Sequence, residues 1–435
     1  MVVIEAAAPP VPFIDSGALM TMLLALAVLL GSAIALGWLA RRIGLPAVVG
    51  EILAGVILGP SILGQAWPWL QHTLFPTDAA RLNLIDAIGQ LGVILLVGLA
   101  GAELDLAFVR RRTSVVTSVG VFAFVVPLGA GIGAGFLIPA SMRTDDVSPT
   151  VLALLLGTAL SVSAIPGIAK ILTEMGLLHR NIGQLILVVG STNDALAWVL
   201  LSVTSSMATV GLRSGNVAAA LIATVGAIGV AVFVLKPLIR PLLDKLENTE
   251  AATGYLVPIC ATLVVACAAV TQALNLEAIL GAFLAGVVIG PRRPALIEPL
   301  RLVTMTVLAP IFLATAGLRV DLRLLGDPTV ALTAAALLIL AVTSKFAGAY
   351  IGARLVRQTR WESVALGSGL NTRGAVEIVI AMTGLRIGVF SAGVYTVIVL
   401  IAIVTSVMAP PMLKYAMSRI SSTEEEHVRE ALRSA

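Results

Sequence analysis

The sequence predicts an all-α protein that crosses a membrane about thirteen times. Of its 435 residues, 58% are hydrophobic and 12% are charged, and the mean hydropathy is +1.03. A soluble domain carries about 25% charged residues, so a chain with half that share is an integral membrane protein. Apolar runs of about 18 residues or more recur from end to end, and each is long enough to span the hydrocarbon layer as a helix.

The thirteen spans are the apolar runs between clusters of polar residues, glycine and proline. We place them at 17–39, 45–63, 84–103, 114–138, 150–172, 182–207, 217–236, 252–274, 276–290, 302–318, 328–352, 362–384 and 391–413. The ninth span is short, and the fifth and twelfth are interrupted. We expect residues 1–16, which contain three prolines, to be a disordered lead-in. A single transmembrane domain then covers 17–414, and 415–435 form a short cytoplasmic tail.

Lysine and arginine are distributed unevenly between the two sides of the membrane. An odd number of spans puts the termini on opposite sides, and the more basic loops face the cytoplasm. With a cytoplasmic C-terminus, 20 of the 28 Lys and Arg residues fall in cytoplasmic segments, six fall in outer segments and two lie within the membrane. The sequence therefore predicts a multi-pass protein of a cell (inner) membrane with its N-terminus outside. Because the basic residues fall between spans, the pI near 9.3 does not indicate a nucleic-acid partner.

Two stretches of the first half recur, in order, in the second half. Residues 49–60 (VGEILAGVILGP) match 280–291 (LGAFLAGVVIGP), and 101–106 (GAELDL) match 317–322 (GLRVDL). Small residues shared in this way can reflect helix packing alone. In the predicted topology, however, the second span runs outward and its match, the ninth, runs inward. We therefore predict inverted repeats, which in many secondary transporters hold the substrate near the midplane where the repeats meet.

The two interrupted spans occupy corresponding places in the repeats. Residues 160–167 (LSVSAIPG) interrupt the fifth span, and residues 369–374 (GLNTRG) interrupt the twelfth. Backbone groups released at a break must bond to protein, water or an ion, because lipid offers no partner. Paired interruptions in corresponding halves are the best indication of a transport site that a sequence offers.

Asp194 lies near the centre of the sixth span, in the sequence GSTNDALAW. A charged side chain at the bilayer centre costs about 2.5–3.5 kcal/mol on insertion scales, so an aspartate there is rare unless it serves a function. We interpret Asp194 as the carrier of a proton and a cation; the alternative is a structural aspartate at a helix interface. The neighbouring Asn193 has no titratable proton and acts either as a cation ligand or as a structural support.

Five further polar residues within the spans are candidates for the site. Lys345, deep in the eleventh span, is either buried near a carboxylate or a helix break, or extends its long stem to the membrane surface. Arg373 either pairs with Glu377 one turn away or compensates partial charges where half-helices end. Ser161 and Ser163 either offer oxygens to the cation or bond back to their own helix.

The sequence lacks the motifs of other functional classes. It contains no histidine metal set, phosphate-binding glycine loop, nucleophile triad or haem ligand pair, so we expect neither an enzyme nor a cofactor. Cys260 and Cys267 lie in one apolar span and are expected to be small core residues without a disulfide.

Three ordered stretches, 159–172 (ALSVSAIPGIAKIL), 191–198 (STNDALAW) and 370–377 (LNTRGAVE), resemble the monovalent cation/proton antiporter superfamily. The resemblance is strongest to the branch of plant cation/proton exchangers and bacterial sodium or potassium/proton antiporters, and it covers about 17–414. It implies a sodium/proton antiporter-like fold with crossed broken helices at 160–167 and 369–377. A six-helix core would move against a dimerisation domain in a homodimer, with Asp194 as the essential aspartate.

The expected function is exchange of Na+ or K+ for protons by alternating access, with Asp194 bound in turn by cation and proton. Two features bear on stoichiometry. Asn193-Asp194 stands where electrogenic relatives carry two aspartates, whereas Lys345 matches a lysine of the electrogenic pattern. The tail is short compared with the regulatory domains of ligand-gated relatives, so ligand gating is not the expected mode of control. The alternatives are a channel-like potassium efflux pathway and an organic-cation/proton transporter on the same fold.

Overall fold

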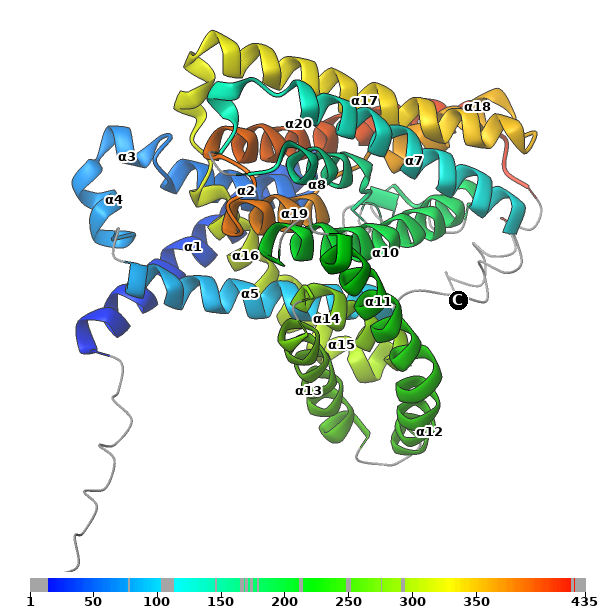
Figure 1. Ribbon diagram of the computed structural model, residues 1–435, viewed down its shortest axis with the longest axis horizontal. Coiled ribbons are helices and arrows are strands. Elements are labelled where there is room, and N and C mark those ends of the chain that lie inside the picture. Colours follow the sequence, from blue (N-terminus) through cyan, green and yellow to red (C-terminus); the bar gives the residue numbers. More distant parts are fainter. Residues whose placement is uncertain are drawn as a thin grey trace, which may run out of the picture.

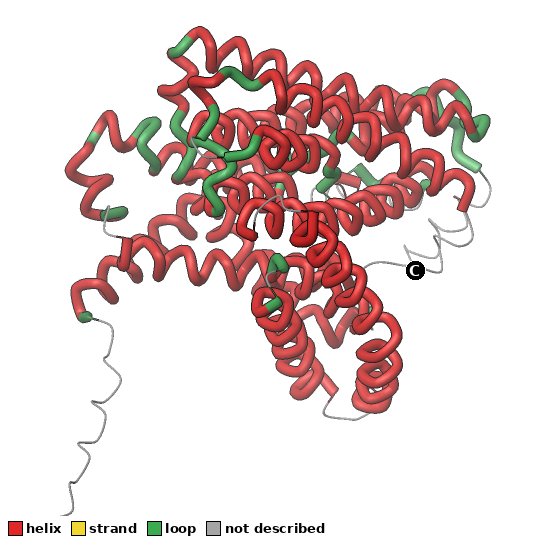
Figure 2. Tube along the Cα trace, viewed as in Figure 1, coloured by secondary structure: helices red, strands yellow, loops and turns green. Residues whose placement is uncertain are grey.

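The computed structural model describes residues 15–76, 79–102, 113–144, 147–164, 180–210, 214–247, 252–274, 276–290 and 294–423, together with residues 168, 171–172, 175–177 and 426. Throughout these residues the only regular secondary structure is helical (Figure 1; Figure 2). The all-α prediction is therefore confirmed. The expected lead-in up to residue 14 and most of the tail after 423 lie outside the described residues.

Each of the thirteen predicted spans corresponds to a helix or a run of helices. Among the described residues, ten helices are long and apolar enough to cross a membrane, and two more are shorter and apolar. The short helices are α8 (Pro149–Ser161) and α14 (Ala278–Ile289), in the fifth and ninth spans. The remaining span, the twelfth, consists of α18 (Arg360–Leu370) and α19 (Ala375–Arg386).

Most of the other helices follow the predicted spans, whereas α4 lies between the second and third spans. They are α1 (Ser16–Arg42), α2 (Ala47–Leu58), α3 (Leu63–Ala66), α4 (Pro68–Leu74), α5 (Ala79–Ala102), α7 (Thr113–Leu137), α10 (Asn181–Val210), α11 (Ser214–Val230), α12 (Lys236–Glu247), α13 (Ala252–Ala273), α15 (Pro294–Val303), α16 (Ala309–Leu318), α17 (Pro328–Leu355) and α20 (Ala392–Met417). Two spans are longer than predicted, because π-helical turns join α11 to α12 and α15 to α16. These continuations were not predicted, because the residues that form them are more polar than the rest of each span.

Side chains mark the start of several helices at the membrane boundary. The carboxylate of Asp15 accepts a hydrogen bond from the Gly17 amide at the start of α1, at 3.0 Å. Asp327 caps α17 in the same way, and Thr359 with Glu362 forms a capping box at the start of α18. Such caps satisfy amide groups that have no partner within the helix.

The repeated sequences pack against each other through glycine. Gly55 of α2 lies against the backbone at Gly317 of α16, and Gly286 of α14 lies against the backbone at Gly101 of α5. A Cβ atom at any of these positions would overlap backbone atoms of the facing helix, so glycine is required for the close approach. Gly55 matches Gly286 in the repeat and Gly101 matches Gly317, so each contact joins the two halves. A two-fold axis relating the halves would produce this exchange of partners.

The helices form two groups, which we name here. The core helices are α7, α8, α10, α17, α18, α19 and α20; the flanking helices are α1, α2, α5 and α11 to α16. Within the core, α7 packs on α8 and α17, and α18 packs on α17 and α20; within the flanking helices, α2 packs on α1 and α16, and α14 packs on α5 and α13. In Figure 1, α7 and α17 run along the upper edge, and α12 and α13 project below. The two groups meet where α10 packs on α11 and α14, α19 packs on α16, and α20 packs on α2.

Candidate functional site

The two interrupted spans meet at their interruptions. We call 162–164, after α8, the first break and 371–374, between α18 and α19, the second break. The Ala164 amide donates to the Thr372 carbonyl at 3.2 Å, and the Ser163 hydroxyl donates to the Leu370 carbonyl at 2.9 Å. The prediction of two crossed broken helices is confirmed in this part of the chain. Residues 165–167, which contain the predicted Pro-Gly breaker, lie outside the described residues.

Gly374 makes the turn from the second break into α19. Its φ of 158° and ψ of −127° lie in a region of backbone space that glycine enters far more readily than other residues. A Cβ at this position would lie 3.5 Å from the Ala164 side chain and 3.7 Å from Val48 of α2. The turn thus sits where the two breaks meet a flanking helix.

Arg373 is fully buried, and its guanidinium donates hydrogen bonds to carbonyl groups of α8 and α17. Its guanidinium bonds to the carbonyls of Ala159 at 3.1 Å and Leu160 at 2.7 Å, in the last turn of α8, and to that of Ala341 in α17 at 3.2 Å. It also pairs with the Glu377 carboxylate at 3.1 Å. The geometry therefore contains both arrangements expected for Arg373, the local ion pair and the contact with helix-end carbonyls.

Lys345 is fully buried, and its ammonium group donates to the carbonyl of Ser161 at the end of α8. It therefore does not extend to the membrane surface. The charges of Arg373 and Asp194 both act on this ammonium group. Because the C-terminus of a helix carries partial negative charge, the end of α8 is compensated by two cations, both from the second half of the chain.

Asp194 lies on α10 at the boundary between the core and the flanking helices, and it is 1% exposed. It lines a cavity of about 10 Å³, room for roughly one water molecule, with Trp198 of the same helix. The other lining residues are Leu96, Val97 and Ala100 of α5, Phe283 of α14, and Ala375, Val376 and Val379 of α19. Asp194 thus shares its cavity with the first turn of α19, where partial positive charge favours an anion.

Two asparagines near the breaks are buried with unmatched side-chain groups. Neither the oxygen nor the nitrogen of the Asn193 and Asn371 amides has a hydrogen-bond partner in the structure. An unmatched buried polar group costs about 1–3 kcal/mol, so these amides are available to water or to an ion. Asn193 is not among the residues that line the Asp194 cavity, and its side-chain oxygen lies 3.8 Å from where a Cβ on Gly120 of α7 would be. Asn371, which lies within the second break, was not among the residues predicted for the site.

Ser161 and Ser163 use their hydroxyl hydrogens within the protein. Ser161 donates to the Thr158 carbonyl of its own helix at 2.8 Å, and Ser163 bonds across to the second break. Neither residue lines the Asp194 cavity. A hydroxyl oxygen that donates still has lone pairs to offer, so their assignment as cation ligands stays a prediction.

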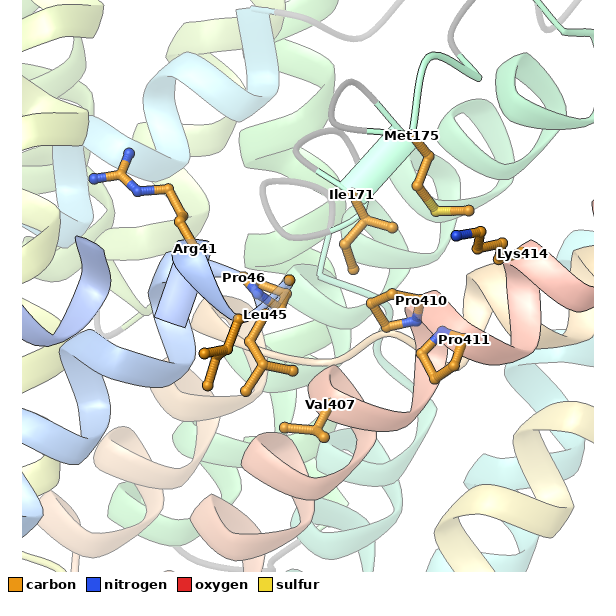
Figure 3. Close-up of a pocket in the computed structure, with 11 residues that line it drawn as sticks. Arg41, Leu45, Pro46, Ile171, Met175, Val407, Pro410, Pro411 and Lys414 are labelled. Carbon is orange, nitrogen blue, oxygen red and sulfur yellow. The ribbon is translucent and has the colours of Figure 1, made fainter. Parts of the chain in front are cut away.

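A larger pocket of about 750 Å³ opens at the end of the interface that is predicted to be cytoplasmic (Figure 3). Leu45 and Pro46, at the start of α2, form one wall, and Val407, Pro410 and Pro411 of α20 form the other. Arg41 and Lys414 are its two charged residues. Just beyond Pro46 and Val407, the side chains of Val48 and Ser406 lie beside Gly374. The pocket therefore leads toward the second break.

Within the described residues, no group of three or more His, Cys, Asp or Glu side chains is arranged to hold a metal ion. Neither Cys260 nor Cys267 forms a disulfide, as predicted. Of the charged residues predicted for the site, Asp194 lines the cavity, and Lys345, Arg373 and Glu377 are buried beside the breaks.

Comparisons with known proteins agree with this arrangement. A family model described as sodium/hydrogen exchanger, transmembrane, matches residues 26–419. The chain is 30% identical over 407 residues to the Na(+)/H(+) antiporter NhaS4 of Synechocystis sp., covering 92% of the chain and 98% of that protein. It is 31% identical over 368 residues to Cation/H(+) antiporter 15 of Arabidopsis thaliana, covering 84% of the chain and 44% of that longer protein. The fold is similar to the solved structure of the sodium proton antiporter MjNhaP1 from Methanocaldococcus jannaschii at pH 8, with a TM-score of 0.67, 13% identity, and coverage of 92% and 99%.

Proposed function

The chain belongs to the sodium/hydrogen exchanger family of cation/proton antiporters, and we propose that Asp194 is the group at which its cation and its proton alternate. The observation that carries this proposal is the position of the Asp194 carboxylate. It is 1% exposed and lies in a cavity between the core and the flanking helices. A site at this boundary can be opened to either side by movement of one group against the other.

In the proposed cycle, Asp194 binds either a proton or a monovalent cation, sodium or potassium. An ionised carboxylate is costly to hold away from water, and either ligand removes most of that cost. The loaded core therefore moves between inward-open and outward-open states, whereas the empty, ionised site resists passage. This difference prevents a leak of ions without exchange.

The cation's other ligands are proposed to be oxygens of water, of the breaks' backbone, and of the Asn193, Asn371, Ser161 and Ser163 side chains. Hard monovalent cations prefer such oxygen ligands. Arg373, Lys345 and Glu377 hold the breaks in position. With a single carboxylate, one cation exchanges for one proton; release of a proton from Lys345 in each cycle would make the exchange electrogenic. A current measurement in planar bilayers distinguishes the two stoichiometries.

We propose a multi-pass protein of the cell membrane with a cytoplasmic C-terminus, in which two copies associate through the flanking helices. Ion pairs support this topology, because each joins residues assigned to one side. Arg180 pairs with Glu426 at 3.0 Å on the proposed inner side, and Arg386 pairs with Glu277 at 3.1 Å on the outer side. Chemical cross-linking in native membranes tests the dimer, and a reporter fused to the C-terminus tests the topology.

Cation-driven proton movement in proteoliposomes containing a pH-sensitive dye tests the function. Sodium and potassium are added separately to vesicles with wild type, with Asp194→Asn, and with Asp15→Asn as a control at an exposed helix cap. We expect a signal with at least one cation in wild type and the control, and none in Asp194→Asn. A folded wild type that moves no protons with either cation would contradict exchange. Cation flux without proton movement would indicate a channel. A response confined to organic cations would indicate an organic-cation/proton transporter.

A further inference from the structure

A second buried carboxylate, Glu277, lies at the proposed outer end of the same interface. It occupies the cap position of α14 and is 6% exposed. One carboxylate oxygen accepts a hydrogen bond from the Ser205 hydroxyl, and the other accepts one from Arg386 at 3.1 Å. The Glu277 amide donates to the Ser202 hydroxyl oxygen at 3.3 Å.

These contacts join the two groups of helices. Glu277 belongs to the flanking helix α14, whereas Ser202 and Ser205 belong to α10 and Arg386 ends α19, both core helices. Arg386 also donates to the side-chain oxygen of Gln90 in the flanking helix α5, at 3.4 Å. Any movement that opens the outer end of the interface must separate Glu277 from Arg386.

The Glu277 cluster is connected to Asp194 along one face of α10. Asp194, Trp198, Ser202 and Ser205 follow one another at intervals of four, four and three residues, which places them on a single helical face. Ser202 lies about 12 Å along the helix axis from Asp194 at 1.5 Å per residue. Between them, Trp198 is 1% exposed and lines the Asp194 cavity. On this face of α10, Trp198 therefore lies between Asp194 and the serines that contact Glu277.

The groups around Glu277 have the chemistry of a cation site. A carboxylate, two serine hydroxyls and the Gln90 amide oxygen are the hard oxygen ligands that alkali cations prefer. The place of the cation is taken by the Arg386 guanidinium, whose side chain is 48% exposed and is therefore free on one side to swing into solvent. The Glu277 side chain, by contrast, is 7% exposed. At the opposite end of the interface, the 750 Å³ pocket is open.

We propose that Glu277, Ser202 and Ser205 form an outer site for the transported monovalent cation, which Arg386 occupies while the outer side is closed. When the core moves, Arg386 leaves and the cation entering from outside takes its place before it passes Trp198 to Asp194. The inference rests on the proposed function, because it assigns a second site on the same route.

A purely structural ion pair predicts different behaviour. If the Glu277–Arg386 pair were only structural, breaking it would lower stability and affect both directions of transport alike. At a cation site, loss of Arg386 leaves a buried carboxylate without its counter-charge, and such a carboxylate attracts another cation strongly. Loss of Glu277 removes the negative charge that attracts the cation from the outer side, and leaves binding from the inner side unchanged.

The test measures the KM for the cation separately from each side, in right-side-out and inside-out vesicles. We expect Glu277→Gln to raise the outer KM about fivefold, the ratio that about 1 kcal/mol gives, and Arg386→Gln to lower it. Ser205→Ala, which retains the ion pair, raises the outer KM less and replaces Glu277→Gln if that variant does not fold. The inner KM stays within about twofold of wild type in all three. The matched control is Asp86→Asn, because Asp86 pairs with Arg319 on the same side but within the flanking helices.

Equal changes of KM on both sides, or no change in folded variants, would overturn the outer site while leaving exchange at Asp194 intact. A wild type without cation-driven proton movement would instead overturn the proposed function. A reversed result for Arg386→Gln, with a raised outer KM, would show that Arg386 positions Glu277 rather than competing with the cation, and would also overturn the proposal.

Discussion

The two breaks meet at one point but differ in what they contribute. The first break follows α8, and its described residues, 162–164, carry no titratable side chain. It offers the carbonyls of the last turn of α8, which accept from Lys345 and Arg373. The second break contains Arg373 itself and leads into Glu377 and the first turn of α19. Toward charged groups, the end of α8 at the first break therefore supplies only carbonyl acceptors, whereas the second break supplies the charge.

This difference makes the first break dependent on the second half of the chain. Both cations that compensate α8 come from there, Lys345 from α17 and Arg373 from the second break. At the second break, by contrast, the charge of Arg373 is balanced within one helical turn, because Arg373 pairs with Glu377. Substitutions that remove a donor should thus affect the first break more than the second, and the following variants test this in order of expected effect.

The largest effect is expected from Asp194→Asn, because it removes the one carboxylate in the cavity beside the second break. Exchange should disappear while the thermal unfolding temperature changes little, since asparagine has nearly the same volume. The dye assay and a thermal shift measurement on the same preparation check both statements. Asp194→Glu, which keeps the charge, should retain part of the activity. Wild-type exchange in Asp194→Asn would refute the central role of this residue.

Arg373→Ala should destabilise the protein by about 3–5 kcal/mol, because Glu377 and the carbonyls of α8 lose their partner in a buried site. A fall in unfolding temperature and in expression would show this. Glu377→Gln is the matched variant: it removes the ion pair but leaves the carbonyl contacts, so its effect should be smaller. Equal stability of the two variants would mean that the first break does not depend on Arg373.

Lys345→Gln should reduce stability by about 1–3 kcal/mol, since glutamine donates more weakly to the Ser161 carbonyl and leaves it partly unsatisfied. If the lysine also carries charge through the cycle, the variant loses any voltage dependence of exchange. Measurements at imposed membrane potentials, compared with wild type, check the second statement. Unchanged unfolding would show that the end of α8 is compensated by Arg373 alone.

The smallest effect is expected from Ser163→Ala, at about 1 kcal/mol, because it removes one hydrogen bond between the breaks. Ser161→Ala is its control: that hydroxyl donates to Thr158 of its own helix rather than across the breaks, so less should be lost. Unfolding in detergent at matched conditions compares the two. A larger loss in Ser161→Ala would show that the hydroxyl of Ser161 has a further role.

The spans and breaks were predictable because the membrane restricts the solutions. Backbone groups in lipid must bond within helices, so length and hydropathy fix each span, and residues such as Gly374 can be located as breaks. The repeat was readable because Gly55, Gly101, Gly286 and Gly317 cannot be replaced where helices touch. The polar extensions of α12 and α15 were missed because their hydropathy falls before their helical backbone ends.

The sequence could name candidate residues for the site but could not predict their arrangement. Helical periodicity shows which residues share a face, but it does not show which neighbour that face meets. Asn193 does not line the cavity that Asp194 lines, because adjacent residues of a helix point in different directions. Asn371 and Glu277 were overlooked since nothing in one dimension shows that they are buried.

Trp198 gives the site a built-in optical reporter. Of the five tryptophans, it is 1% exposed, whereas Trp38, Trp67 and Trp69 are between 49% and 77% exposed. Its indole shares the cavity with Asp194, so a change in the charge of that carboxylate changes the electric field at the ring. The emission of the unlabelled protein can therefore follow occupancy of the site in real time, and replacing the other four tryptophans by phenylalanine would leave the emission of this one residue.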